Sequence, residues 1–153
     1  MKIYNVSKHS IMMIVSLVLI LLILFFIAMK LITPSTIIMT NENYTEILKD
    51  CHDKPYTYVN KKIISSGYIF RTSDFSDTRF VLARDMLINE SESRIVGFLC
   101  EYGNANEFEN NEWVSIEGIL TLGDYHGEMP IIQVNDISRI TTPNDIFVLP
   151  PEI

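Results

Sequence analysis

Residues 11–29 form a continuous apolar stretch without a charged side chain, and Ser16 is its only strongly polar member. As an α-helix these 19 residues extend about 28 Å at about 1.5 Å each, close to the hydrocarbon thickness of a bilayer. Leu31 and Ile32 can lengthen the helix while the ammonium group of Lys30 reaches the interface. The pattern predicts one transmembrane helix.

A cleaved signal peptide is the alternative interpretation of this stretch. Its apolar region is normally about 7 to 15 residues long and ends in small residues at a cleavage site. The present stretch is longer, and its exit at 25–30 lacks the small-x-small pattern. We therefore favour a retained anchor over a removed leader.

The pattern then changes from helical to alternating. Asn41 can cap a helix in which Tyr44, Ile47 and Leu48 recur at helical spacing, and Pro55 ends it near residue 53. We divide the chain into an N-terminal tip with the membrane helix (1–33), a linker with a short helix (34–60), and a β domain with an extended C-terminal tail (61–153).

Alternating apolar and polar residues predict five short strands in the β domain. The polar stretch between the third and fourth strands can form a short helix, and in-strand glycines are typical of sharply bent barrel strands. This order predicts a mainly β fold, a small five-stranded OB-like barrel with a short helical insert. The predicted strands cover 63–71, 80–84, 94–101, 113–122 and 130–140.

The two parts of the chain differ in charge. Residues 1–33 contain three lysines and no acid, whereas the rest holds all 19 acids and nine bases. Nonspecific nucleic-acid binding needs a basic surface, so we expect no nucleic-acid partner. Lys2 and Lys8 precede the apolar helix and only Lys30 follows it. The positive-inside rule therefore predicts a cytoplasmic N-terminus and a β domain outside the cell membrane.

The two cysteines, Cys51 and Cys100, leave two possibilities open. They can pair, which would stabilise the fold by roughly 4 kcal/mol in the chain-entropy model, or remain separate thiols. Spacing alone does not decide, because pairing depends on the distance in space. Separate thiols are the simpler interpretation.

Candidates for chemistry are few. Asp124, His126 and Glu128 alternate in a loop and are weak candidates for metal ligands, because such loops are usually solvated turns. The adjacent Cys51, His52 and Asp53 suggest a nucleophile, yet neighbouring side chains on a helix diverge. No phosphate-binding glycine loop or nucleophile elbow occurs. We expect no catalytic residue, no cofactor and no enzyme activity.

From Pro55 onward, about two thirds of the chain resembles the C-terminal domain of an uncharacterised family of bacterial membrane proteins. Its members are described as permease subunits or YcgQ-like proteins, usually encoded beside a predicted permease. The matching features are Pro55-x-x-Tyr58, Lys61-Lys62, Gly67-Tyr68-Ile69-Phe70, Phe80-Val81-Leu82-Ala83-Arg84, Val96-Gly97-Phe98-Leu99-Cys100-Glu101, Asn111-Glu112-Trp113-Val114-Ser115-Ile116-Glu117-Gly118, Pro130-Ile131-Ile132-Gln133-Val134 and Pro143-Asn144-Asp145-x-Phe147-Val148.

This chain departs from the resembled family in two ways. Family members usually have several membrane spans, and they carry cysteines in the loop after the second strand. Here a single span is predicted and that loop has no cysteine. Any metal or redox chemistry of those cysteines is therefore not expected here. Asn89, Glu90 and Glu92 are weak candidates for a ligand site in the same loop, whereas a solvated acidic loop is the simpler interpretation.

The anchor and the resemblance together imply a non-enzymatic accessory module. We expect it to be held by the lipid bilayer as a single-pass membrane protein, with a membrane-protein partner such as a permease. The alternative is an OB-fold domain that binds an oligonucleotide or an oligosaccharide on its barrel face. Strand aromatics could serve such binding, but core packing is their default role.

Overall fold

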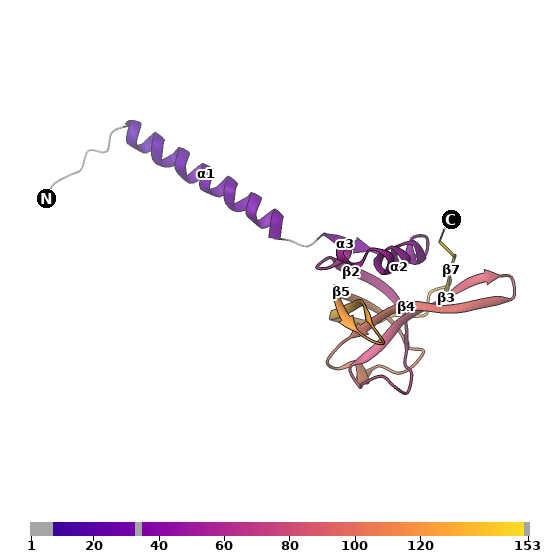
Figure 1. The fold of residues 1–153 in the computed structure, drawn as a ribbon. Coiled ribbons are helices and arrows are strands. Elements are labelled where there is room, and N and C mark those ends of the chain that lie inside the picture. Colours follow the sequence, from indigo (N-terminus) through magenta and orange to yellow (C-terminus); the bar gives the residue numbers. More distant parts are fainter. Residues whose placement is uncertain (1–7, 33–34, 152–153) are drawn as a thin grey trace. The chain divides into compact units, whose positions relative to one another are not determined.

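The computed structural model describes residues 8–32 and 35–151, which belong to two separate units, Met1–Pro34 and Ser35–Ile153 (Figure 1). In the first unit, α1 (Lys8–Ile32) is a single helix. Among the described residues it is the one helix long and apolar enough to cross a membrane, and its candidate span is Lys8–Phe26. The predicted apolar helix is therefore present. The tip before residue 8 and the boundary at 33 and 34 lie outside the described residues.

The second unit is mostly β, with short helices before the first long strand and between the third and fourth barrel strands. Its helices are α2 (Tyr44–Asp53), α3 (Pro55–Tyr58) and a 3₁₀ turn, η1 (Ala105–Glu107). Its strands are β1 (Thr36–Ile38), β2 (Lys62–Phe70), β3 (Arg79–Asn89), β4 (Glu92–Glu101), β5 (Trp113–Asp124), β6 (Glu128–Arg139) and β7 (Phe147–Val148).

Five of these strands close into the predicted OB-like barrel. The pairing runs β2-β5-β6-β4-β3 and returns to β2, with β4 and β6 parallel and the other neighbours antiparallel. Closure removes most free edges, which is how small barrels satisfy their backbone groups. β1 adds in parallel to β2, and β7 adds in parallel to β3.

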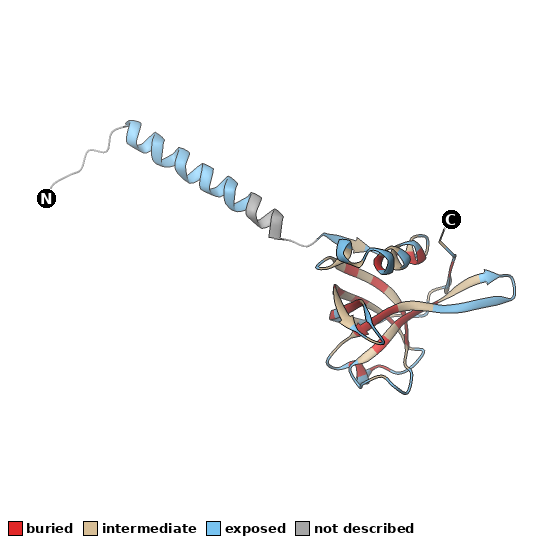
Figure 2. Ribbon diagram, in the orientation of Figure 1, coloured by how far each residue is buried: buried red, intermediate tan, exposed pale blue. Residues whose placement is uncertain are grey.

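Apolar side chains from all five barrel strands fill the interior, and α2 covers part of it with Tyr44 and Cys51 (Figure 2). Alternation explains this placement most clearly in β5, where Val114, Ile116 and Leu120 are each almost fully buried. The barrel therefore has one continuous core, and α2 covers part of it.

Several predicted boundaries are wrong. β3 continues to Asn89 rather than ending at Arg84, and β4 begins at Glu92. The polar loop expected between these two strands is therefore the tight tip of a long hairpin that extends beyond the barrel (Figure 1). Its polar residues hid the strand because both faces of its outer part are exposed and alternation is lost. The insert forms only η1, a single turn.

The expected cap of α2 is also wrong. Asn43 rather than Asn41 occupies the N-cap position, and the Asn43 Oδ1 atom accepts a hydrogen bond from the Thr40 N–H at 2.7 Å. The Asn41 side chain is used elsewhere, as an acceptor for a guanidinium N–H of Arg84 at 2.5 Å. The sequence pattern predicted that Asn41 caps the helix, but its side chain instead binds Arg84, a residue distant in sequence.

Arg84 is a buried cation at the junction of three segments, with 2% of its surface exposed. Its guanidinium also donates to the backbone oxygens of Ser66 at 3.4 Å, Ile146 at 3.3 Å and Asp145 at 3.3 Å. It thereby joins the segment before α2, strand β2 and the chain that leads into β7.

Candidate functional site

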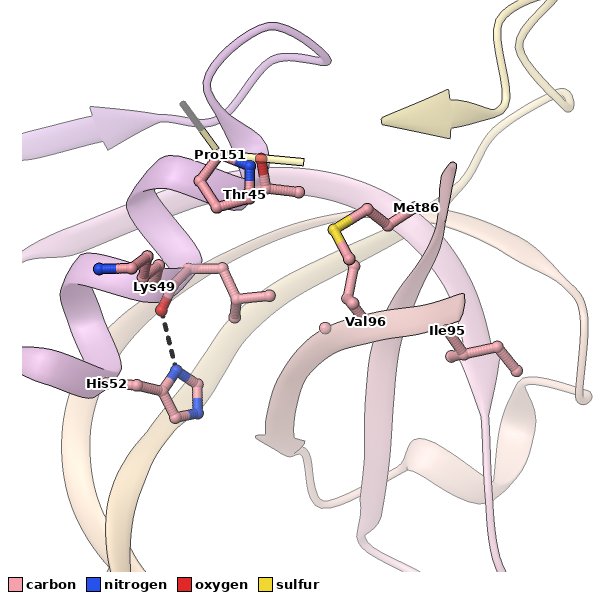
Figure 3. Close-up of a pocket in the computed structure, with 9 residues that line it drawn as sticks. Thr45, Lys49, His52, Met86, Ile95, Val96 and Pro151 are labelled. Carbon is pink, nitrogen blue, oxygen red and sulfur yellow. Dashed lines mark hydrogen bonds between the residues drawn. The ribbon is translucent and has the colours of Figure 1, made fainter. Parts of the chain in front are cut away.

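A groove of about 450 Å³ lies between α2 and β4 (Figure 3). Four residues of α2 form one wall, and β4 with the adjoining part of β3 forms the other. Pro151 of the C-terminal tail contributes to one end. The lining residues are Thr45, Leu48, Lys49, His52, Met86, Ile95, Val96, Gly97 and Pro151.

The groove walls are held by specific contacts. The Thr45 hydroxyl donates to the backbone oxygen of Leu149 at 2.6 Å, which ties the tail against α2. The His52 ring stacks on buried Phe98 with centroids 6.0 Å apart, and its Nδ1 lies 2.8 Å from the Leu48 carbonyl oxygen (Figure 3). Because a carbonyl only accepts, Nδ1 is the donor in this contact. The other ring nitrogen of a neutral His52 can then accept.

The groove lining contains a lysine and a histidine but no acid, although the domain as a whole is acidic. Lys49 and His52 are the only ionisable side chains in its lining, and no carboxylate lines it. Lys49 Nζ lies 2.7 Å from Asp53 Oδ2, an exposed pair within α2. This hydrogen bond with Asp53 raises the pKa of Lys49. The groove therefore has an apolar floor and a rim on which Lys49 is paired with Asp53 and His52 presents its second ring nitrogen.

Asn89, Glu90 and Glu92 lie together at the tip of the β3–β4 hairpin, where all three are exposed. The Asn89 Oδ1 atom accepts hydrogen bonds from the N–H and the hydroxyl of Ser91 at 3.0 and 3.1 Å. The Asn89 amide nitrogen lies 3.4 Å from Glu92 Oε2. Polar side chains of this tip thus form hydrogen bonds with one another within the turn.

Asp124, His126 and Glu128 lie in the β5–β6 turn, where Asp124 and Glu128 are register partners. His126 has a positive φ of 58°. The Glu128 carboxylate accepts a hydrogen bond from the Tyr56 hydroxyl at 2.8 Å. Within residues 8–32 and 35–151, no group of three His, Cys, Asp or Glu residues is arranged to hold a metal ion.

The residues of the possible nucleophile cluster point to different surroundings. Cys51 is fully buried, whereas Asp53 is exposed and pairs with Lys49. Burial raises the pKa of Cys51 to about 12, with a further contribution from Asp50. Cys100 is buried as well, and its burial also raises the pKa of its thiol. Both cysteines are free thiols, so they remain separate.

Neither thiol is expected to react in the folded protein. At pH 8 a pKa of about 12 leaves about one thiol in ten thousand ionised, and the thiolate is the reactive form. Iodoacetamide should therefore leave the folded full-length chain unmodified, whereas chain denatured in urea should gain two carbamidomethyl groups by mass spectrometry. Modification of the folded chain at a rate near that of a free thiol would contradict this.

Several strand aromatics that could have stacked on bases are instead packed inside the domain. Phe80 and Phe98 are fully buried, and Tyr68 is 8% exposed. Tyr68 and Trp113 pack edge to face with centroids 5.8 Å apart. The expectation of core packing is confirmed for Phe80, Phe98 and Tyr68, and these rings do not form an exposed stacking platform.

The groove was not predicted from sequence. Lys49 and His52 precede Ile95, Val96 and Gly97 by more than 40 positions. One local signal was available: Ile95 and Val96 are adjacent apolar residues beside a polar hairpin tip, whereas a half-buried strand alternates. That signal indicates a strand with apolar side chains on both faces.

Fold and helix together define the class: a small OB-like barrel domain in a chain that also carries one N-terminal apolar helix. The model of the DUF1980 C-terminal domain matches residues 27–150. The chain belongs to this family, which agrees with the resemblance noted from the sequence.

Two curated relatives are similar at low identity. A Streptococcus mutans protein named "Putative two-component membrane permease complex subunit" is 22% identical over 114 residues, covering 72% of this chain and 41% of that protein. UPF0703 protein YcgQ of Bacillus subtilis is 21% identical over 123 residues, covering 78% of this chain and 43% of that protein. The chain thus spans about two fifths of the length of these relatives.

One similar solved structure is titled "Crystal structure of a putative aspartyl-tRNA synthetase from Leishmania major Friedlin". The TM-score is 0.38 at 10% identity, covering 73% of this chain and 22% of that one. Similarity at this level supports no conclusion about activity.

Proposed function

We propose that this protein is a membrane-anchored, non-enzymatic module that works with a membrane-protein partner in a permease-type complex. The observation that carries the proposal is membership of the DUF1980 C-terminal domain family, together with similarity to a relative that is named as a permease complex subunit. An apolar helix of spanning length in the same chain supports placement at a membrane. The burial and raised pKa of Cys51 favour binding over thiol chemistry.

Crosslinking in native membranes tests this proposal. The full-length chain is treated with a lysine-reactive crosslinker, purified under denaturing conditions and analysed by mass spectrometry. We expect recovery of a membrane protein with several spans. The matched control joins residues 1–34 to an unrelated soluble domain, so that lipid proximity alone is reproduced. Equal recovery with the control, or recovery of no membrane protein, would contradict the proposal.

We further propose that the β domain lies outside the cytoplasmic membrane, on the basis of Lys2 and Lys8 before the helix and Lys30 after it. A single exposed cysteine at Ser73 reports the side, because the native thiols are buried. We expect Ser73→Cys to react with a membrane-impermeant maleimide on intact cells as fully as in lysed cells. Labelling only after lysis would show that the β domain lies on the cytoplasmic side and would contradict this proposal.

A further inference from the structure

The outer part of β4 has an unpaired edge. β4 pairs with β3 along its whole length, but its pairing with β6 covers only Leu99–Glu101. Across the described residues, no strand pairs with the other side of β4 from position 92 to 98. In an antiparallel pair, about half of the backbone N–H and C=O groups of each strand point away from its partner. These groups are therefore available to another strand.

The groove reaches this open edge from the face of the sheet that carries Met86 on β3 and Val96 on β4. Successive side chains of a strand point to opposite faces, so a hollow on one face is lined by every second residue. This groove is lined by three residues in succession, Ile95, Val96 and Gly97. Figure 3 shows α2, with Lys49 and His52, on the opposite side of the space from β4.

Edges of this kind are normally protected, and here the protection is incomplete. Charged side chains commonly shield exposed edge strands, and Arg94 and Glu92 do so near the hairpin tip. After Arg94, strand β4 continues toward the barrel with the uncharged residues Ile95, Val96 and Gly97. Ile95 is 49% exposed. An exposed apolar edge beside a groove is the arrangement by which proteins bind extended peptides through strand addition.

We propose that the β4 edge binds an extended segment of the membrane-protein partner as an added strand, with apolar side chains on the groove floor and an acidic side chain at Lys49 and His52. Charge complementarity supports this occupant, because Lys49 lines the groove, no acid lines it, and an incoming carboxylate can replace Asp53 in the exposed pair with Lys49. The inference rests on the proposed function, since it names where that partner docks.

Cysteine footprinting tests the docking edge. Ile95→Cys places a thiol at the open edge, and Ile38→Cys is the control, because Ile38 is a 60% exposed isoleucine on the outer strand β1. N-ethylmaleimide labelling of the full-length chain is compared between native membranes and vesicles that contain this chain alone. We expect labelling at position 95 to slow at least tenfold in native membranes and labelling at 38 to change less than twofold.

Charge reversal tests the acidic contact. Lys49→Glu in the Ile95→Cys chain should restore fast labelling in native membranes. Lys54→Glu is the matched control, because Lys54 also pairs with an aspartate four residues away but does not line the groove. We expect Lys54→Glu to leave position 95 protected. Equal effects of the two reversals would overturn the assignment of an acid to this rim.

Amide hydrogen exchange then identifies the occupant as a strand. Strand addition should slow exchange at about half of the amides between 92 and 98 in native membranes. A slow cysteine with unchanged amides would overturn strand addition. Protection in the single-component vesicles that rises with protein density would assign the edge to a second copy and overturn the partner. If position 95 is labelled fast but a membrane partner is still crosslinked, this edge alone is rejected. If position 95 is labelled fast and no membrane partner is crosslinked, the proposed function is rejected as well.

Discussion

Arg84→Ala is expected to lower the free energy of unfolding of the β domain by about 4 kcal/mol. Removal of a buried hydrogen-bonded cation leaves several acceptors without donors, and each such buried group costs about 1–3 kcal/mol. These acceptors are the Asn41 side chain and the backbone oxygens of Ser66 and Ile146, whereas the Asp145 oxygen keeps a hydrogen bond from the Asn41 amide at 3.2 Å. The guanidinium also lies 5.1 Å from the centre of the Trp113 ring, so that a cation–π contact is lost as well.

Thermal and urea unfolding of the full-length chain in detergent measures this effect. Trp113 is the chain's single tryptophan and contacts Arg84, so its fluorescence reports the region that changes. Arg94→Ala is the control, because Arg94 has a 69% exposed side chain and lies 3.8 Å from an exposed carboxylate of Glu92. We expect less than about 0.5 kcal/mol for that change. Equal losses in the two variants would refute a special role for Arg84.

The strands that could be predicted are those with one buried face. In β5 every second position from 114 to 120 faces the core, with Val114, Ile116 and Leu120 buried and Gly118 between them. Alternation alone therefore located this strand. The outer half of the β3–β4 hairpin has no buried face, and its ends were misplaced. β7 has two residues and is defined by its partner β3, which sequence alone does not name.

From sequence, candidate site residues could be grouped only where they are neighbours along the chain. Asn89, Glu90 and Glu92 are such a case, and the structure places them together at one hairpin tip. The groove instead depends on how α2 lies beside the barrel, a relation set by packing of Tyr44 and Cys51 into the core. Arg84 likewise reads as an ordinary strand residue until its distant acceptors are known.

Gly118→Ala is expected to destabilise the β domain by about 3 kcal/mol, near the upper end of the usual cost of overpacking a core. A Cβ atom at this position would lie 2.5 Å from the carbonyl oxygen of Gln133 and 2.6 Å from a methyl carbon of Ile132. Both neighbours are on β6, and the oxygen belongs to the backbone, so relief requires the two strands to separate. The β5–β6 register shifts between Glu117 and Gly118, which indicates that the close approach accompanies an irregularity of the barrel wall.

Gly103→Ala provides the matched control, because a Cβ atom there would meet nothing within 4 Å. Its φ angle is not in the left-handed region, so alanine is tolerated and should change the free energy of unfolding by less than about 1 kcal/mol, in the stabilising direction. Both variants are measured by urea unfolding of the full-length chain in detergent. If Gly118→Ala were as stable as Gly103→Ala, the wall between β5 and β6 would have to be loose enough to admit a methyl group. The core residues on either side, Ile116 and Leu120, would then be expected to exchange their amides quickly, whereas a tight wall keeps those amides among the slowest in the domain.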